Sequence, residues 1–180
     1  MKILNFLPMM MLCLAGCSDN KDPDSNSDPQ GLECEPGRLA SDFRMAGPLA
    51  GPGVGEDGKL VAGTYVVGAT YLRLKPDVAA QQKFNEVVGP ISLALMSQPG
   101  LVALQIGSSD ECGTARTFSV WESEEAMYNF VGGGPHGAAV GAIGQVSRGG
   151  SIVTHWETGP EGATWEEALK RLAAVEGLGY

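Results

Sequence analysis

The order of strand and helix patterns over residues 64–157 is the feature that most constrains how this chain can fold. Thr64–Lys75 is rich in β-branched and aromatic residues and predicts a strand, and the apolar residues that follow Pro76-Asp77 recur at helical spacing. Ser123 predicts the start of a second helix, because Ser is a favoured N-cap. Three further strands are predicted at residues 101–107, 115–121 and 150–157. The order strand–helix–strand–strand–helix–strand predicts an α+β, ferredoxin-like βαββαβ domain.

A last amphipathic segment follows the fourth predicted strand. Thr164 and Glu167 form a capping box, and apolar residues continue at helical spacing to Ala173, so an added C-terminal helix is expected. The predicted sheet is antiparallel with its two helices on one face, which leaves the other face in need of a cover. Pairing of two sheets face to face in a homodimer is one way to provide that cover.

The first residues have the pattern of a bacterial export signal. Lys2 precedes a short apolar segment, Ile3 to Leu14, which is too short to span a bilayer. Leu14-Ala15-Gly16-Cys17 matches a lipobox, which implies cleavage before Cys17 and attachment of lipid, with acyl chains such as palmitate, to that residue. An ordinary cleaved signal with an incidental cysteine is the alternative. In a Gram-negative source, Ser18 after the lipidated cysteine would favour the outer membrane.

Charge and cysteine content limit the partners. Removal of residues 1–16 takes away Lys2 and no acid, so the formal net charge of -9 becomes -10. Nucleic acid and anionic lipid surfaces are therefore poor partners. With Cys17 lipidated, Cys34 and Cys112 remain in an oxidising compartment, and a disulfide between them is expected, with two free thiols as the alternative.

Three segments are expected: a signal peptide at residues 1–16, a lipidated cysteine with a flexible tether at residues 17–58, and one folded domain at residues 59–180. The tether prediction rests on the many Asp, Ser, Asn, Pro and Gly residues of this segment and its few large apolar ones. A disulfide between Cys34 and Cys112 would hold the second half of the tether to the domain.

Residues Phe118 to Val140 resemble a known family. The run FSVWESEEAMYNFV, followed after a short loop by PHGAAV, resembles the antibiotic biosynthesis monooxygenases of the dimeric α/β barrel superfamily, and within it the sequences similar to spheroidene monooxygenase. The resemblance covers about residues 65–160 of this chain. It implies a domain that dimerises face to face, a ligand site between sheet and helices, and oxygen chemistry. Some family members bind haem and others use no cofactor.

His136 is the first candidate for a functional residue. It lies in the first turn of a helix that Pro135 is expected to start, where the helix dipole lowers the pKa of the imidazole and favours its neutral form. A neutral imidazole is the form that binds iron, so His136 is a candidate catalytic residue and haem ligand. A capping or hydrogen-bonding role is the alternative. Gly132, Gly133 and Gly134 leave the neighbouring backbone bare, which would let a flat ligand approach.

Four other residues are candidates. The resemblance implies that Trp121 helps to shape the active site and that Phe130, on the second predicted helix, contacts substrate; a core aromatic is the alternative for Trp121. Tyr71 and Arg73 share one face of the first strand and could contact a polar group of a substrate, although an exposed strand face explains them equally well. His155 is interpreted as an ordinary strand histidine. The first strand lacks the Asn that haem-degrading and cofactor-free family members carry there.

These observations lead to two functional hypotheses. The first is a lipid-anchored, extracytoplasmic monooxygenase-like protein that acts on or binds a hydrophobic small molecule, with haem as a candidate cofactor. The second is a non-catalytic ligand-binding or envelope lipoprotein that retains only the fold. Under either hypothesis the chain is expected to be a homodimer that the lipid on Cys17 holds at the cell envelope.

Overall fold

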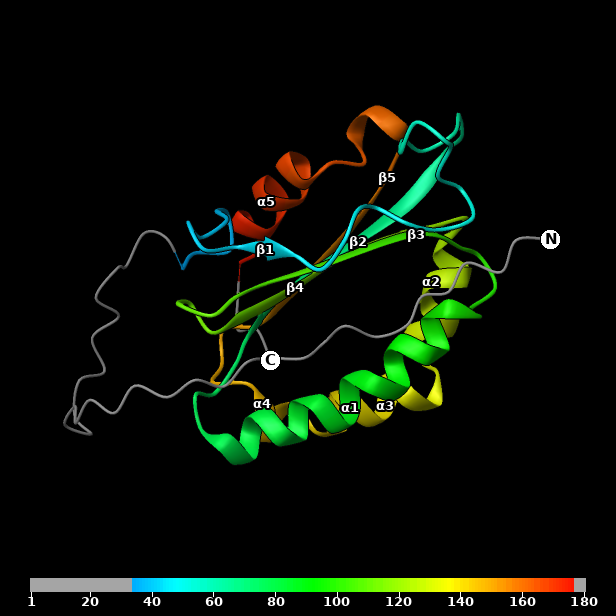
Figure 1. Cartoon of the computed structure of the whole chain (residues 1–180). Coiled ribbons are helices and arrows are strands. Elements are labelled where there is room, and N and C mark those ends of the chain that lie inside the picture. Colours follow the sequence, from blue (N-terminus) through cyan, green and yellow to red (C-terminus); the bar gives the residue numbers. More distant parts are fainter. Residues whose placement is uncertain (1–33, 177–180) are drawn as a thin grey trace.

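The computed structural model of the chain describes residues 34–176 (Figure 1). The expected signal peptide, the lipidated Cys17 and the first part of the expected tether lie outside the described residues.

An antiparallel sheet forms the centre of the molecule. Its strands are β1 (Arg44–Met45), β2 (Tyr65–Arg73), β3 (Leu101–Ser109), β4 (Thr114–Trp121) and β5 (Ile152–Thr158). The strand order in the described residues is β1-β3-β4-β2-β5, and every neighbouring pair is antiparallel. Without the short β1, this is the arrangement of a ferredoxin-like fold, in which the first and third long strands lie side by side at the centre. The predicted α+β fold is therefore confirmed.

The helices begin where the sequence places good N-caps. They are α1 (Val78–Met96), α2 (Glu124–Val131), α3 (Gly134–Gly141), α4 (Ile143–Val146), the 3-10 helix η1 (Pro160–Gly162) and α5 (Trp165–Ala173). The side chains of Asp77, Ser123 and Thr164 each accept a hydrogen bond from the backbone N–H three residues later. The added C-terminal helix is thus present. In the described part of the chain, no helix has both the length and the apolar character needed to cross a membrane.

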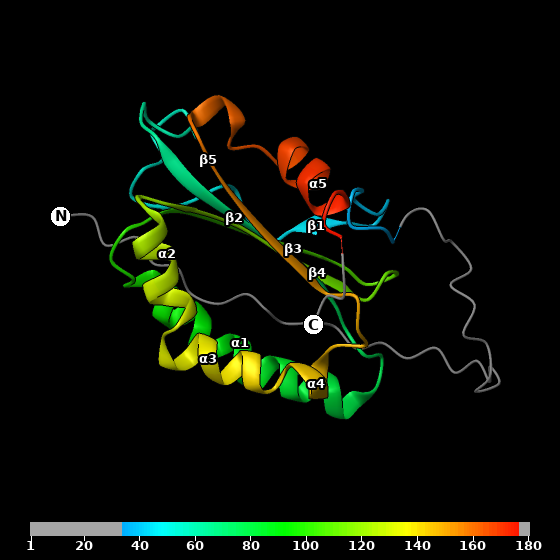
Figure 2. The same ribbon diagram turned by 180° about the vertical axis from the view of Figure 1, so that it is seen from behind.

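Helices lie on both sides of the sheet (Figures 1 and 2). Helices α1 to α4 lie on one side and α5 on the other, and we call the two sheet surfaces the α1-side face and the α5-side face. Because side chains alternate along a strand, Val67 and Tyr71 of β2 point to the α5-side face and Val66 to the α1-side face.

The chain itself covers the α5-side face. Val67, Phe118 and Val120 are 0–2% exposed there, and Leu172 of α5 is 1% exposed. The Phe118 ring lies between Trp156 and Trp165, with centroid separations of 6.4 and 5.4 Å. Leu49, Val54 and Leu60 of the N-terminal region pack against the same cluster. The structure thus differs from the expectation that a second copy covers the sheet, because α5 and the N-terminal region occupy that surface.

Residues 34–58 also differ from the expected tether. A disulfide joins Cys34 to Cys112 in the loop between β3 and β4, with 5.3 Å between the Cα atoms, and it confirms the predicted pairing. The next residues, which we call the strap (residues 34–38), lie over Arg116, which donates hydrogen bonds to the carbonyls of Glu35, Pro36 and Arg38. The few apolar residues of residues 34–58 are enough to pack this region because the disulfide and these hydrogen bonds fix its start.

Candidate functional site

Three of the predicted site residues meet on the α1-side face. The rings of Trp121 at the end of β4 and Phe130 on α2 stack with a centroid separation of 5.3 Å and an interplanar angle of 29°. The His136 ring on α3 meets Phe130 edge to face at 5.0 Å. Trp121 is 1% exposed and Phe130 is also buried, whereas His136 is half-buried. The structure therefore joins Trp121, Phe130 and His136 into one contiguous group, which we call the aromatic group.

Hydrogen bonds fix the orientation of Trp121. Its indole Nε1–H donates to Ser119 Oγ at 2.9 Å, and the Ser119 hydroxyl donates to the carbonyl of Gly68 at 3.2 Å. A Cβ atom at Gly68 would lie 3.0 Å from Ser119 Oγ and 3.6 Å from Met127 Sδ. The glycine thus provides the room that this bonded pair and Met127 occupy. Ser119 is a residue of the site that the sequence did not single out.

The surroundings of His136 determine its protonation state. Its Nδ1 lies 3.0 Å from the carbonyl oxygen of Val131. A carbonyl can only accept, so Nδ1 carries the hydrogen and Nε2 keeps its lone pair. Burial lowers the pKa of His136 below its ordinary value, and the hydrogen bond to Val131 offsets part of that effect. The expected direction of the pKa shift agrees with the structure, in which burial is the larger cause.

Glycines leave the backbone beside His136 bare. Added Cβ atoms at Gly134 and Gly137 would meet no other atom within 4 Å. At Gly133 an added Cβ would lie 3.0 Å from the carbonyl oxygen of Phe130, so that glycine is needed for the turn into α3. The space next to Gly134 and Gly137 fits the expectation that a flat molecule could approach here.

Exposure on the α1-side face increases from one end of the sheet to the other. At the end next to α2, Trp121 and Val66 are almost fully buried, at 1% and 4% exposed. Farther from α2 along the strands, the residues of this face are half-buried: Thr70, Leu72, Ile106, Ala115 and Thr117. The hydroxyl groups of Thr70 and Thr117 form a hydrogen bond across β2 and β4. The aromatic group therefore borders an apolar strip of sheet that carries one hydroxyl pair.

Tyr71 and Arg73 lie on the α5-side face, away from the aromatic group. Tyr71 is 1% exposed, its hydroxyl donates to the carbonyl of Cys34, and the Arg116 guanidinium lies 4.4 Å from the centre of its ring. Arg73 is half-buried against Gly150, where an added Cβ would lie 3.0 Å from Nη1. Strand alternation separates this pair from Val66, Gly68 and Thr70, and the structure does not bring it together with His136. A role of the pair in substrate binding stays a prediction.

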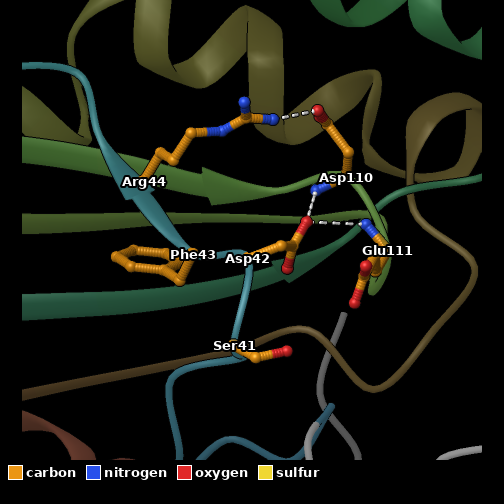
Figure 3. Close-up of a pocket in the computed structure, with 6 residues that line it drawn as sticks. All are labelled: Ser41, Asp42, Phe43, Arg44, Asp110 and Glu111. Atoms are coloured by element: carbon orange, nitrogen blue, oxygen red, sulfur yellow. Dashed lines mark hydrogen bonds and ion pairs between the residues drawn. The ribbon is translucent and has the colours of Figure 1, made fainter.

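A separate hollow of about 410 Å³ lies beside the loop between β3 and β4 (Figure 3). Asp42 in its wall accepts hydrogen bonds from the Ser109 hydroxyl and from the backbone N–H groups of Asp110 and Glu111. Burial acts to raise the pKa of Asp42, but these three hydrogen bonds outweigh it and lower the pKa. The carboxylate thus ties the N-terminal region to the turn. Among residues 34–176, no three His, Cys, Asp or Glu side chains form a group that could hold a metal ion.

His155 lies on the edge strand β5. Its Nε2 is 3.4 Å from Glu124 Oε1, and its ring meets Tyr128 edge to face at 5.9 Å. The side chains of His155 and Glu124 are 40% and 62% exposed, so this is a surface pair of small energetic weight. The interpretation of His155 as a strand histidine agrees with this position.

Comparison with known proteins gives structures but no sequence family. No family model and no curated protein matches the chain. Rv0793 from Mycobacterium tuberculosis is 15% identical, with a TM-score of 0.46 over 51% of this chain and 92% of that protein. A Caulobacter crescentus CB15 protein with the provisional name antibiotic biosynthesis monooxygenase is 24% identical, with a TM-score of 0.44 over 53% and 89%. A mutant of SnoaB, a cofactor-independent oxygenase from Streptomyces nogalater, is 15% identical, with a TM-score of 0.40 over 52% and 90%.

Two of these three proteins are named as monooxygenase or oxygenase. About half of this chain is covered in each case.

Proposed function

We propose that the protein is monooxygenase-like and binds a hydrophobic small molecule on the α1-side face, against the aromatic group. The observation that carries the proposal is the contact of Trp121, Phe130 and His136 at the border of the half-buried, apolar strip of the sheet. Ligand sites of this kind are mostly apolar, with few polar groups that orient the ligand. His136, the Ser119 hydroxyl and the Thr70–Thr117 hydroxyl pair are polar groups of this region.

His136 can act as a proton acceptor in such a site. Its Nε2 carries a lone pair, and its lowered pKa keeps the ring neutral at pH 7. A hydroxyl or an acidic C–H group of a bound molecule would transfer its proton to Nε2, which leaves an anion on the molecule and an imidazolium on the protein. The resulting electron-rich anion is the form of an organic substrate that can transfer electrons to oxygen. Phe130 and His136 would border the molecule, and the buried Trp121 would support Phe130 from behind.

Haem is the cofactor to test. The donor set of this region is a single imidazole nitrogen, which fits haem with one protein ligand and does not fit a metal ion held by side chains alone. In this haem-dependent form His136 would hold the iron through Nε2 instead of accepting a proton there, and the bare backbone at Gly134 and Gly137 leaves room beside the ring. Bound haem would supply the activation of oxygen.

The second candidate function is ligand binding without catalysis. Among the described residues, the His136 side chain forms a hydrogen bond to a backbone carbonyl, and no carboxylate bonds to the ring. A site with one unassisted imidazole can bind and orient a molecule without transforming it.

The proposal includes a location at the cell envelope. We propose that residues 1–16 are removed and that lipid on Cys17 anchors the protein there, in the outer membrane of a Gram-negative source. The Cys34–Cys112 disulfide supports this location, because such bonds persist in oxidising compartments outside the cytoplasm.

Two titrations of the chain from Ser18 onward test the proposal, since a chain that began at residue 59 would lack the strap. One uses haemin and follows the Soret band, and the other uses the apolar dye Nile red and follows its fluorescence. The variant is His136→Ala, and the control is His155→Ala, which changes the other histidine of the chain.

A Soret shift that saturates at one haem per chain and disappears only in His136→Ala would support the haem-dependent form of the proposal. Nile red binding without any Soret shift, weakened in a Trp121→Ala variant, would support ligand binding without haem. If the unmodified chain gave neither a Soret shift nor a change in Nile red fluorescence, the proposal would be contradicted.

A further inference from the structure

The N-terminal part of the described chain is attached at only one of the two ends of the sheet. We call the end where β2 finishes and β4 begins the strap end, because the Cys34–Cys112 disulfide fixes the strap there. The opposite end, where β4 finishes and α2 begins, is the α2 end. Figure 1 shows the start of the described chain, in blue, and the β3–β4 loop on one side of the molecule and α2 on the other. The chain that leads to Cys17 therefore joins the domain at the strap end.

Charge is distributed unevenly between these ends. Acidic residues collect at the α2 end, where β4 and β5 finish: Glu122, Glu124, Glu125, Glu157 and Glu161. The strap end has charges of both signs. Its arginines are Arg38, Arg44, Arg73, Arg116 and Arg148, and its acids are Glu35, Asp42, Asp110 and Glu111. An anionic membrane surface repels the α2 end more strongly than the strap end, and the domain has a preferred orientation beside it.

Along the central strands, the residues of the α1-side face become more exposed toward the same strap end. Along β2, the residues change from the buried Val66 to the half-buried Thr70 and Leu72, and β3 runs from the half-buried Leu104 and Ile106 to the exposed Ser108. The α5-side face shows no such change: Val120, Phe118 and Arg116 are all 2% exposed or less. The more exposed part of the proposed ligand region and the attachment point of the chain thus lie at the same end of the sheet.

We infer that the strap end faces the membrane, and that the molecule bound on the α1-side face is one dissolved in the bilayer. The inference rests on the proposed function, including lipidation of Cys17. An apolar molecule with one hydrogen-bonding group fits the strip, because Leu72 and Ile106 line it and the Thr70–Thr117 pair supplies a hydroxyl. Such a molecule passes from the lipid to the aromatic group past the half-buried residues, without crossing the acidic end.

Paramagnetic relaxation tests the orientation. The full lipidated chain is placed in bilayers that contain phosphatidylglycerol and a lipid with a spin-labelled headgroup, and amide signals are compared with those in unlabelled bilayers. We expect the amides of Gly113 and Ser151, at the strap end, to lose several-fold more signal than those of Ser123 and Gly159, at the α2 end. Equal losses, or larger losses at the α2 end, would overturn the inference without affecting the proposed function.

Dye transfer tests the entry route. Vesicles loaded with Nile red are mixed with the full chain, its Leu72→Trp variant and the control Leu93→Trp, which changes an exposed leucine of α1. We expect Leu72→Trp to slow transfer several-fold and Leu93→Trp to leave it unchanged, with the relaxation pattern the same in all three. Equal transfer by all three chains would overturn the inference. A chain that binds no Nile red from water or from vesicles overturns the proposed function and this inference with it.

Discussion

Arg116 is a buried cation whose hydrogen-bond partners are backbone carbonyls. It is 2% exposed, and its guanidinium donates to Pro36 at 2.8 Å, to Glu35 at 2.9 Å and to Arg38 at 2.6 Å. Burial lowers the pKa of Arg116 to about 10, an effect that Tyr71 partly opposes. The side chain is therefore still charged at pH 7, and the strap satisfies most of its donors.

Replacement of Arg116 should destabilise the fold. In Arg116→Met the three strap carbonyls lose their donors, and a loss of about 3 kcal/mol in the free energy of unfolding is expected, since bonds to charged groups contribute roughly 1.5–3 kcal/mol each and are not additive. Urea unfolding measures it. The control Arg44→Gln removes an ion pair whose side chains are 72% and 68% exposed, and it should cost less than about 1 kcal/mol. Equal losses in the two variants would contradict the role assigned to Arg116.

The pKa of His136 should depend on Phe130. Burial is the main cause of the lowered pKa, so Phe130→Ala, which uncovers the ring, should raise the pKa toward the ordinary value of 6.5. An NMR titration of the imidazole measures the change. Tyr128→Ala is the control, because Tyr128 contacts His155 instead. A pKa that is the same in Phe130→Ala and in the unmodified chain would show that Phe130 is not the group that buries the ring.

The lowered pKa of His136 also makes the free energy of unfolding depend on pH. The folded pKa of His136 lies below the unfolded value, so between the two the unfolded chain binds more protons. This contribution to stability is present above the unfolded pKa, near 6.5, and is lost as the pH falls through the folded pKa. His136→Gln should remove this part of the pH dependence of unfolding.

At the scale of elements, α5 owes its position to one apolar stripe. Leu172 is 1% exposed against the α5-side face, whereas Leu93 of α1 is 69% exposed. Leu172→Ala should cost about 2–5 kcal/mol, as buried leucines do, and Leu93→Ala should change the free energy of unfolding by no more than about 0.5 kcal/mol. Thermal and urea unfolding of the pair measure the difference. Similar costs would mean that α5 is not tightly docked.

The sequence predicted the helices and strands from interactions between near neighbours in the chain, but it did not predict contacts between distant segments. Ser123 and Thr164 cap helices through bonds to residues three positions away, so the sequence contains the whole interaction. Arg116 bonds to carbonyls 78 to 81 positions away, which leave no side-chain pattern to read. Leu49 and Leu60 lie too far apart to form a periodic stripe, so their packing on the core could not be expected.

The candidate site was predictable in part for the same reason. Trp121, Phe130 and His136 lie within sixteen consecutive residues, and the strand–helix–turn between them decides how they meet. For Tyr71, strand alternation shows which residues share its face of the sheet, but it does not show whether that face is the one next to α1 or the one next to α5. The position of Tyr71 beneath α5 and the strap depends on segments at the two ends of the described chain.

For the whole molecule, the covered α5-side face predicts a monomer. Face-to-face pairing of two sheets would need Val67 and Phe118 to be available, and both are at most 2% exposed beneath α5 and the N-terminal region. Light scattering of the chain from Ser18 onward should give the mass of one chain at micromolar concentration. A stable dimer would show that the chain pairs through a different surface, or that α5 leaves the sheet.

The Cys34–Cys112 bond also determines what a protease can release. In the turn that begins at Gly55, residues Glu56 to Lys59 are exposed, and such turns are common sites of cleavage. A cut at Lys59 would divide the polypeptide into two pieces, yet the disulfide, which spans 78 positions, would keep both pieces in one covalent molecule. If Cys17 carries lipid, a nicked domain stays at the membrane, and its release requires both a cut and a reductant.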